Sequence, residues 1–146
     1  MLKKHVHIRR IAAALLCLAA AVSCSNEETS LFIGDYSVSY HHHHTKGAYQ
    51  SDFVDNGTVS IEDAGDGKVK LSGYVSYEGR VTDDILLLSS FKRSGSGQGF
   101  SYEYSYSFEP AIYNSGEVVI NMTVKGFSGP DSYNENSSFI LTKKSK

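Results

Sequence analysis

Four consecutive histidines at positions 41–44 are the most conspicuous side chains that could do chemistry. In a β-strand alternate residues face the same side, about 6.6 Å apart, so His41 and His43 form one pair and the other two histidines a second. Two such imidazoles can converge on Zn²⁺, Cu²⁺ or Ni²⁺. A complete site needs a third ligand, such as Asp52 or Asp55. We take His41 and His43 as candidate metal ligands; the alternatives are a polar strand end and a pH-responsive patch.

Aromatic side chains occupy every second position from residue 100 to residue 108. On a strand, this alternation places five rings on one face: Phe100, Tyr102, Tyr104, Tyr106 and Phe108. Such a face could bind a sugar, a lipid or a flat aromatic molecule, because the rings supply contact area and the phenols add polar groups. The candidate ligand contacts are Tyr102, Tyr104 and Tyr106, together with Tyr36. The alternatives are a barrel core filled by its own rings and an outward-facing partner surface.

Motifs of the common enzyme classes are absent from the sequence. It has no G-x-S-x-G elbow, no H-E-x-x-H pair, no P-loop and no dinucleotide-binding fingerprint. The acids Asp83, Asp84, Glu103 and Glu109 are scattered, and neighbouring residues on a strand point to opposite faces. We therefore expect no catalytic residues and no cofactor, and a protein that is not an enzyme.

The elements that must position these side chains are strands. Apolar and polar residues alternate with period 2 along the chain, and no segment has a convincing helical period. Turn signals fall at 55–57, 65–67, 94–99, 114–116 and 129–131. We predict eight strands: 35–45, 48–54, 57–63, 68–77, 83–92, 99–109, 117–126 and 137–144. Their simple succession predicts an all-β fold, a single antiparallel up-and-down β-barrel, because closure removes exposed edges. A β-sandwich is the alternative.

The first 23 residues have the organisation of a signal peptide. Basic residues up to Arg10 precede the apolar stretch Ile11–Val22, which spans only about 18 Å as a helix, whereas a hydrocarbon core is about 30 Å thick. We therefore predict three regions: a lipoprotein signal peptide at 1–23, an acylated N-terminus and tether at 24–31, and a barrel domain at 32–146.

Cys24 ends the tetrapeptide Ala-Val-Ser-Cys, which resembles a bacterial lipobox. In a lipobox the cysteine is lipidated on its thiol and becomes the new N-terminus. The acidic segment 25–28 is similar to the export tether of Bacteroidetes-type lipoproteins. This resemblance implies an outer-membrane lipoprotein anchored through Cys24, exposed on the cell surface or facing the periplasm. Ordinary secretion with cleavage nearby and a free Cys24 is the alternative.

The mature domain is acidic. Removal of residues 1–23 takes four of the 14 Lys and Arg residues and none of the 16 Asp and Glu residues, which leaves a net charge near −6. That charge argues against a nucleic-acid partner and against electrostatic adhesion to anionic lipid. With Cys17 removed and Cys24 lipidated, the domain has no disulfide, and at about 115 residues it is long enough to rest on its own core.

The segment Phe32–Val38 resembles the G-x-W/Y opening of lipocalin and calycin barrels, with Tyr36 at the aromatic position. With the lipobox and the segment 57–73, it makes the chain similar to small lipocalin-like outer-membrane lipoproteins of Bacteroidetes type, a group without an agreed biochemical function. The resemblance covers most of residues 32–143. It implies a barrel in which a basic residue late in the chain packs over the Tyr36 ring, with Lys143 as the nearest candidate.

These observations predict a lipid-anchored, non-enzymatic β-barrel that binds a small hydrophobic or glycan-like ligand at the cell envelope. One alternative is a filled barrel that serves as a protein-interaction, scaffold or inhibitor module through loops such as 94–99 and 113–116. Another is a Zn- or Cu-binding protein built on the histidine run. The expected partners are accordingly the membrane, a small ligand and an envelope protein.

Overall fold

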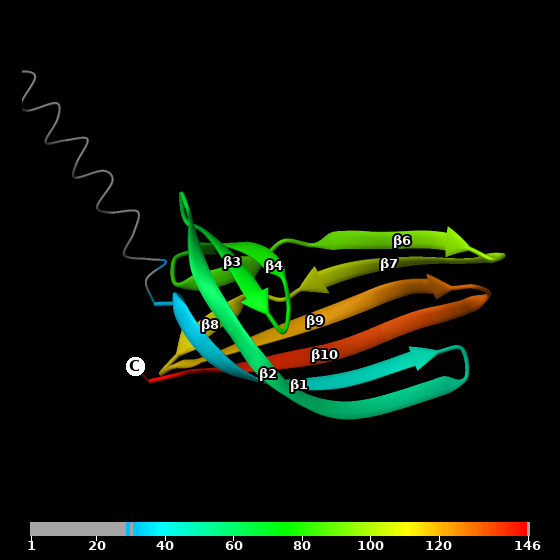
Figure 1. Ribbon diagram of the computed structural model, residues 1–146, viewed down its shortest axis with the longest axis horizontal. Coiled ribbons are helices and arrows are strands. Elements are labelled where there is room, and N and C mark those ends of the chain that lie inside the picture. Colours follow the sequence, from blue (N-terminus) through cyan, green and yellow to red (C-terminus); the bar gives the residue numbers. More distant parts are fainter. Residues whose placement is uncertain (1–28, 30, 146) are drawn as a thin grey trace, which may run out of the picture.

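The computed structural model describes residue 29 and residues 31–145, and β-strands dominate this part of the chain (Figure 1). The strands are β1 (Gly34–Lys46), β2 (Tyr49–Gly65), β3 (Lys68–Gly73), β4 (Tyr77–Thr82), β5 (Ile85–Leu88), β6 (Phe91–Gly97), β7 (Phe100–Phe108), β8 (Ala111–Asn114), β9 (Glu117–Ser128) and β10 (Asp131–Lys143). None of the described residues belongs to a helix that is long and apolar enough to cross a membrane. The predicted signal peptide and the lipidation of Cys24 lie outside the described residues.

Eight of the ten strands in the described part of the chain close into an antiparallel barrel, which confirms the predicted all-β barrel. The barrel order is β10-β1-β2-β3-β4-β5-β8-β9, and pairing of β9 with β10 closes the ring. The succession is not simple, because the hairpin β6–β7 leaves the barrel between β5 and β8 and pairs with β9 instead. Closure leaves the barrel without an exposed strand edge.

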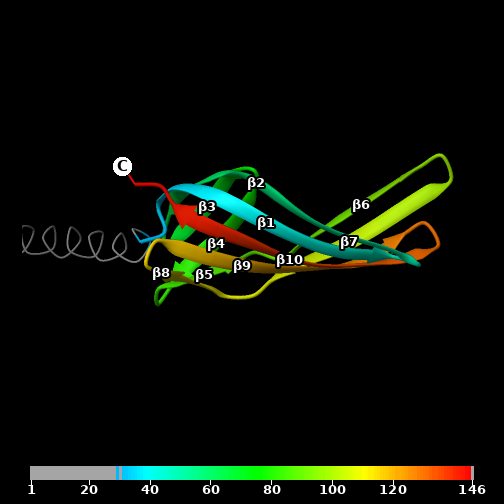
Figure 2. The same cartoon turned by 90° about the horizontal axis from the view of Figure 1, so that it is seen from below.

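The hairpin β6–β7 extends the sheet beyond the barrel. The first residues of β9 pair with β8, whereas its second half, from Met122 onward, pairs with β7. A six-stranded sheet, in the order β6-β7-β9-β10-β1-β2, therefore runs past the barrel end (Figure 1), and Figure 2 shows the β6–β7 hairpin turned away from β9 and β10. We call this part the sheet extension, made of residues 40–55, 91–108 and 122–139.

Apolar side chains from all eight barrel strands form the core. They alternate with exposed side chains, as the period-2 pattern predicts: in β9, Val118, Ile120 and Val124 are each no more than 1% exposed. Full burial of a Val, Leu, Ile, Phe or Met side chain stabilises the fold by roughly 1.5–3 kcal/mol, so this core is the main stabilising contribution.

Tyr36 and Lys143 form a packed pair at the start of the barrel. The Tyr36 side chain is 0% exposed, and its hydroxyl donates to the backbone oxygen of Phe32 at 2.7 Å. Burial raises the pKa of this phenol to about 12. The Lys143 ammonium donates to the backbone oxygen of Leu31 at 2.8 Å and lies 5.8 Å from the centroid of the Tyr36 ring. This is the contact that the lipocalin-like resemblance implies for Lys143.

Several predicted strand boundaries are wrong. The turn expected at 55–57 does not form: β2 continues through it and stays paired with β1. The ring of Tyr74 packs so close to Gly57 that it would collide with a Cβ there. The predicted strands 68–77 and 83–92 each divide into two, and β8 is an additional short strand. β10 begins at Asp131 rather than at 137, and this earlier start adds polar residues to the sheet extension.

The turns expected at 65–67, 114–116 and 129–131 are confirmed. At the first of these, Asp66 has φ 54° and Gly67 has φ 73°. Two successive positive φ angles are the signature of the type I′ turn, whose twist matches that of a hairpin. Residues that tolerate positive φ therefore form the turns that connect neighbouring strands in these hairpins.

Candidate functional site

The inner face of the sheet extension continues the inner face of the barrel. Side chains alternate along each strand, so the register decides which of them share this face: His42, for example, lies opposite Phe53 on β2 and Ser137 on β10. We call this surface the aromatic face; its side chains are Tyr40, His42, His44, Phe53, Phe91, Tyr102, Tyr104, Tyr106, Tyr133, Glu135 and Ser137. Two of the four histidines, His42 and His44, therefore lie on the same face as the predicted aromatic row.

The aromatic row lies on β7 with its rings on one side, as predicted. Tyr106 stacks on Phe91 with the ring centroids 4.4 Å apart, and Tyr104 packs against Tyr133 at 4.7 Å. Tyr102 stacks on Tyr104 at 5.2 Å. The three tyrosines of the row are half-buried, and two of them also pack against the barrel core. The row therefore forms a wall that is fixed at its base and still accessible, rather than a plug inside the barrel.

Glu135 lies within this face and is the acceptor for a network of hydrogen bonds. Only 6% of the residue is exposed. Its Oε1 accepts from the hydroxyls of Tyr40 at 2.7 Å and Ser137 at 2.6 Å, and its Oε2 accepts from Tyr133 at 2.8 Å. The Nδ1 atom of His42 lies 2.9 Å from Oε1. Two strands, β1 and β10, thus supply all of these contacts.

The network keeps the carboxyl ionised and the phenols neutral. Burial raises the pKa of Glu135, but the hydrogen bonds from Ser137, Tyr40 and Tyr133 and the charge of His42 together outweigh burial, and the pKa lies below its ordinary value of 4.5. Burial and the neighbouring carboxylate raise the pKa values of Tyr40 and Tyr133 well above 10.0. At neutral pH the aromatic face therefore holds an ionised carboxylate beside His42, and the Arg93 guanidinium lies on the same face over Phe91 and Tyr106.

The two histidines of this face extend the network along β1. The Nε2 atom of His42 lies 2.6 Å from Nδ1 of His44, and the His42 ring stacks on Phe53 at 4.4 Å. His44 packs in turn against Tyr133 at 5.6 Å and Tyr49 at 5.7 Å. Ring stacking and hydrogen bonding together restrict both imidazoles.

A pocket of about 300 Å³ opens where the inner face of the barrel passes into the aromatic face. Its lining residues are Tyr40, Tyr74, Val75, Tyr77, Tyr106, Met122, Glu135 and Phe139. We call it the mouth pocket. Its lining combines four tyrosines and three apolar side chains with one buried carboxylate, so aromatic surface and polar groups converge there, as they do in small-molecule sites.

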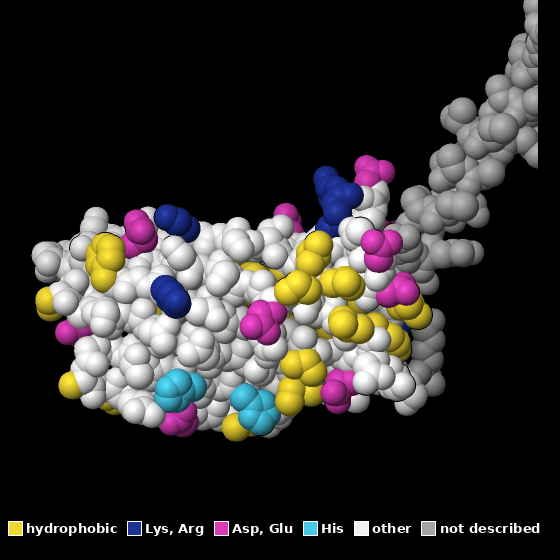
Figure 3. Space-filling model, turned by 180° about the vertical axis from the view of Figure 1, so that it is seen from behind, with side chains coloured by type: hydrophobic (Ala, Val, Ile, Leu, Met, Phe, Trp, Pro, Cys, Tyr) yellow, Lys and Arg dark blue, Asp and Glu magenta, His cyan; other side chains and the backbone are white. Residues whose placement is uncertain are grey.

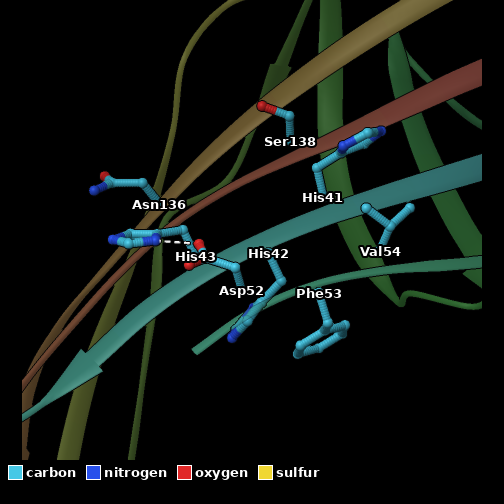
Figure 4. A pocket seen from close by; sticks show the side chains of 8 residues that line it. All are labelled: His41, His42, His43, Asp52, Phe53, Val54, Asn136 and Ser138. Atoms are coloured by element: carbon cyan, nitrogen blue, oxygen red, sulfur yellow. Dashed lines mark hydrogen bonds and ion pairs between the residues drawn. The ribbon is translucent and has the colours of Figure 1, made fainter. Parts of the chain in front are cut away.

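His41 and His43, the predicted metal ligands, lie on the opposite, outer face of β1. They line a surface pocket of about 400 Å³ with Asp52, Asn136 and other residues, and Figure 4 shows them on the other side of the strand from His42. The Nδ1 atom of His43 contacts the Asp52 carboxylate, whereas His41 contacts Ser39. Seen from behind, histidine and acidic side chains lie side by side at this end of the molecule (Figure 3).

Asp52 thus reaches His43, as one of the two expected third ligands, but the other, Asp55, does not join it. Asp55 accepts a hydrogen bond from the Tyr74 hydroxyl at 2.8 Å, on the inner face. Within the described residues, no group of three or more His, Cys, Asp or Glu side chains is arranged to hold a metal ion. Metal binding at His41 and His43 stays a prediction.

Tyr36 lies apart from the three tyrosines with which it was grouped. It is fully buried beside Phe32 and Lys143, so it has no surface that a ligand can reach without opening the barrel. Sequence reasoning also missed Glu135 and Tyr133. The segment 133–137 is almost entirely polar, so it has no period-2 pattern, and the predicted strand began only at 137.

A comparison with models of protein families found no match to this chain, and a comparison with curated proteins found no significant match either.

Proposed function

We propose that the protein is a non-enzymatic binding protein for a small hydrophobic or glycan-like ligand, held on the aromatic face and in the mouth pocket. The observation that carries this proposal is a row of half-buried tyrosines beside an open pocket that contains a buried, ionised carboxylate. The fold is a closed barrel with an accessible inner face at one end, which is an arrangement suited to binding.

The aromatic face is organised before any ligand arrives. Tyr104 and Tyr106 each stack on a ring from a neighbouring strand, and Tyr40 and Tyr133 are fixed by hydrogen bonds to Glu135. A ligand therefore pays little conformational entropy in these side chains, and tyrosine gives large contact area for only two rotatable bonds. The phenol hydroxyls supply polar contacts that suit a glycan-like ligand.

The proposed location is the outer membrane. We propose that Cys24 carries the lipid anchor and that the acidic tether presents the domain at the cell surface, with a periplasm-facing domain as the alternative. The net charge near −6 of the mature domain makes nucleic acid an unfavourable partner.

A second candidate function is a protein-interaction module, favoured by the exposed side of β2. In the sheet extension this strand pairs only with β1, so it is an edge strand. Tyr49, Phe53 and Val54 on it are 62%, 46% and 59% exposed. An edge strand with exposed apolar side chains can pair with an envelope protein.

Native mass spectrometry of the untagged protein, released gently from its own membrane, tests the proposed function. We expect a reproducible added mass beyond the lipid. Tyr104→Ala should reduce the occupied fraction at least about tenfold, since aromatic side chains dominate such contacts. The matched control is Phe127→Ala, which removes an aromatic side chain that is 42% exposed on the other face of β9.

Two outcomes would contradict the proposal of a small ligand on the aromatic face. One is a bare mass with lipid only, and a stoichiometric envelope protein in the same preparation would then favour the second candidate. The other is an equal loss of the added mass in both variants, because that would place the ligand away from the aromatic face.

A further inference from the structure

The carboxylate of Glu135 in the mouth pocket forms no ion pair with a described lysine or arginine. In the described part of the chain, the ion pairs are His42 with Glu135 and His43 with Asp52. A buried carboxylate is costly unless it is paired or hydrogen-bonded. The hydroxyls around Glu135 satisfy its oxygen atoms, but they leave its net charge in the pocket.

Two of the rings that line the mouth pocket, Tyr40 and Tyr77, hold no lysine or arginine of the described chain over their faces. Other aromatic faces do hold one: Lys143 lies 5.8 Å from the Tyr36 centroid, Lys46 lies 5.6 Å from Phe100 and Arg93 lies 5.5 Å from Tyr106. Among the described residues, no Lys or Arg lies over Tyr40 or Tyr77, which both line the mouth pocket. Arg93 reaches the edge of the pocket at Tyr106 but forms no ion pair with Glu135.

We propose that the mouth pocket binds the cationic group of its ligand, a quaternary ammonium, against the rings of Tyr40 and Tyr77 and next to Glu135. Aromatic faces attract cations, most strongly where water is excluded, and a buried carboxylate adds a Coulombic attraction. This inference rests on the proposed function and names the chemical class of its ligand.

Both carboxylate oxygens of Glu135 already accept hydrogen bonds, which favours a quaternary ammonium over a primary one as the ligand. Oε1 already faces Tyr40, Ser137 and His42, and Oε2 accepts from Tyr133. A primary ammonium brings three donors that each need an acceptor. A methylated ammonium has no N–H donor, so it can use the field of the carboxylate and the faces of the rings without a free oxygen.

Choline and its uncharged isostere 3,3-dimethylbutan-1-ol are the probes that test this inference on the mature protein. They have nearly the same shape and differ in charge. We expect choline to bind at least about tenfold more tightly, measured by titration calorimetry and by shifts of the tyrosine ring protons. Glu135→Gln should abolish this preference and keep an acceptor for the hydroxyls. Asp52→Asn, which removes a carboxylate on the outer face, should leave it unchanged.

The wild-type comparison of the two probes needs no variant, so it stands even where Glu135→Gln fails to fold. Equal affinity for both probes, or no detectable binding of choline, overturns the inference. If the protein taken from its membrane still carries an added mass that depends on Tyr104, the proposed function stands while the cationic ligand class falls. If that mass is also absent, both fall.

Discussion

Glu135 contacts His42 and Asp52 contacts His43, and both histidines belong to β1. The two pairs nevertheless have different roles, because only the first is buried. Glu135 is buried and accepts from three hydroxyls, so its removal would leave several polar groups without an acceptor. The side chains of His43 and Asp52 are 41% and 65% exposed, and water competes for that contact. Exposed pairs of this kind contribute little to stability. Both pairs join a histidine to a carboxylate, so it is burial, not residue type, that lets the pair of His42 and Glu135 fix the side chains around it.

The lowered pKa of Glu135 predicts how its contribution to stability depends on pH. In the folded protein the pKa lies below its ordinary value of 4.5, so the unfolded chain takes up the proton more readily. The contribution is therefore fully present above about pH 4.5 and is lost as the pH falls through the folded-state value. We expect the difference in unfolding free energy between wild type and Glu135→Gln to shrink between pH 7 and pH 3, measured by urea denaturation.

Asp52→Asn is the matched control for this measurement. Its carboxylate is 65% exposed, so we expect a small difference from wild type at every pH. A Glu135→Gln difference that grew as the pH fell would contradict the assigned direction of the pKa shift.

At the scale of the elements, the close approach of β7 and β9 depends on Gly126. The register places this glycine between Tyr104 and Tyr133, whose rings meet across it. A Cβ at this position would lie 1.8 Å from the backbone oxygen of Glu103. The missing side chain therefore lets β7 join the sheet and brings two halves of the aromatic face together.

We expect Gly126→Ala to destabilise the protein by about 1–3 kcal/mol or more, because the strands must separate to admit the methyl group. It should also weaken any binding that depends on Tyr104. The matched control is Gly97→Ala in β6, where a Cβ meets no atom within 4 Å, and there we expect a change within about 0.5 kcal/mol. Urea denaturation of both variants checks this prediction. Similar losses of stability in the two variants would show that β7 and β9 can admit a methyl group at position 126 without separating.

The elements were predictable from sequence where local patterns agree with the final pairing. Alternation in β9 and the turn at Asp66 and Gly67 are local signals, and both were confirmed. The turn signal at 55–57 failed because β2 pairs with β1 without a break from Tyr49 to Ile61, and the ring of the distant Tyr74 packs against Gly57. Long-range packing of this kind leaves no mark on the neighbouring sequence.

The candidate site was predictable only in part, for the same reason. The aromatic row of β7 is visible as an alternation, and the histidine run as a repeat. Their meeting on one face is a result of the register between β1, β10, β9 and β7, which no local pattern gives. Glu135 stands in a polar segment without periodicity, so only the register reveals that it is buried.

At the scale of the whole molecule, a closed barrel supports an open sheet. The barrel carries most of the fully buried side chains, such as Val59, Leu71 and Leu141, whereas Tyr102, Tyr104 and Tyr106 in the sheet extension are half-buried. This division separates the stabilising core from the proposed binding face. The barrel can hold the strands in register while the aromatic face stays accessible at its end.

The single strand β2 allows a direct test of this division, because it belongs to both parts. At 59–61 it pairs with both β1 and β3, at 62–63 it pairs with β3, and it carries the buried Val59 and Ile61. At 49–55 it pairs with β1 alone and is largely exposed. Local opening of an edge costs less free energy than opening of the core. In hydrogen-exchange mass spectrometry we therefore expect amides of 49–55 to exchange at least about tenfold faster than those of 59–63. Equal protection along β2 would mean that the barrel and the sheet extension open as one cooperative unit, and that the aromatic face is as rigid as the core.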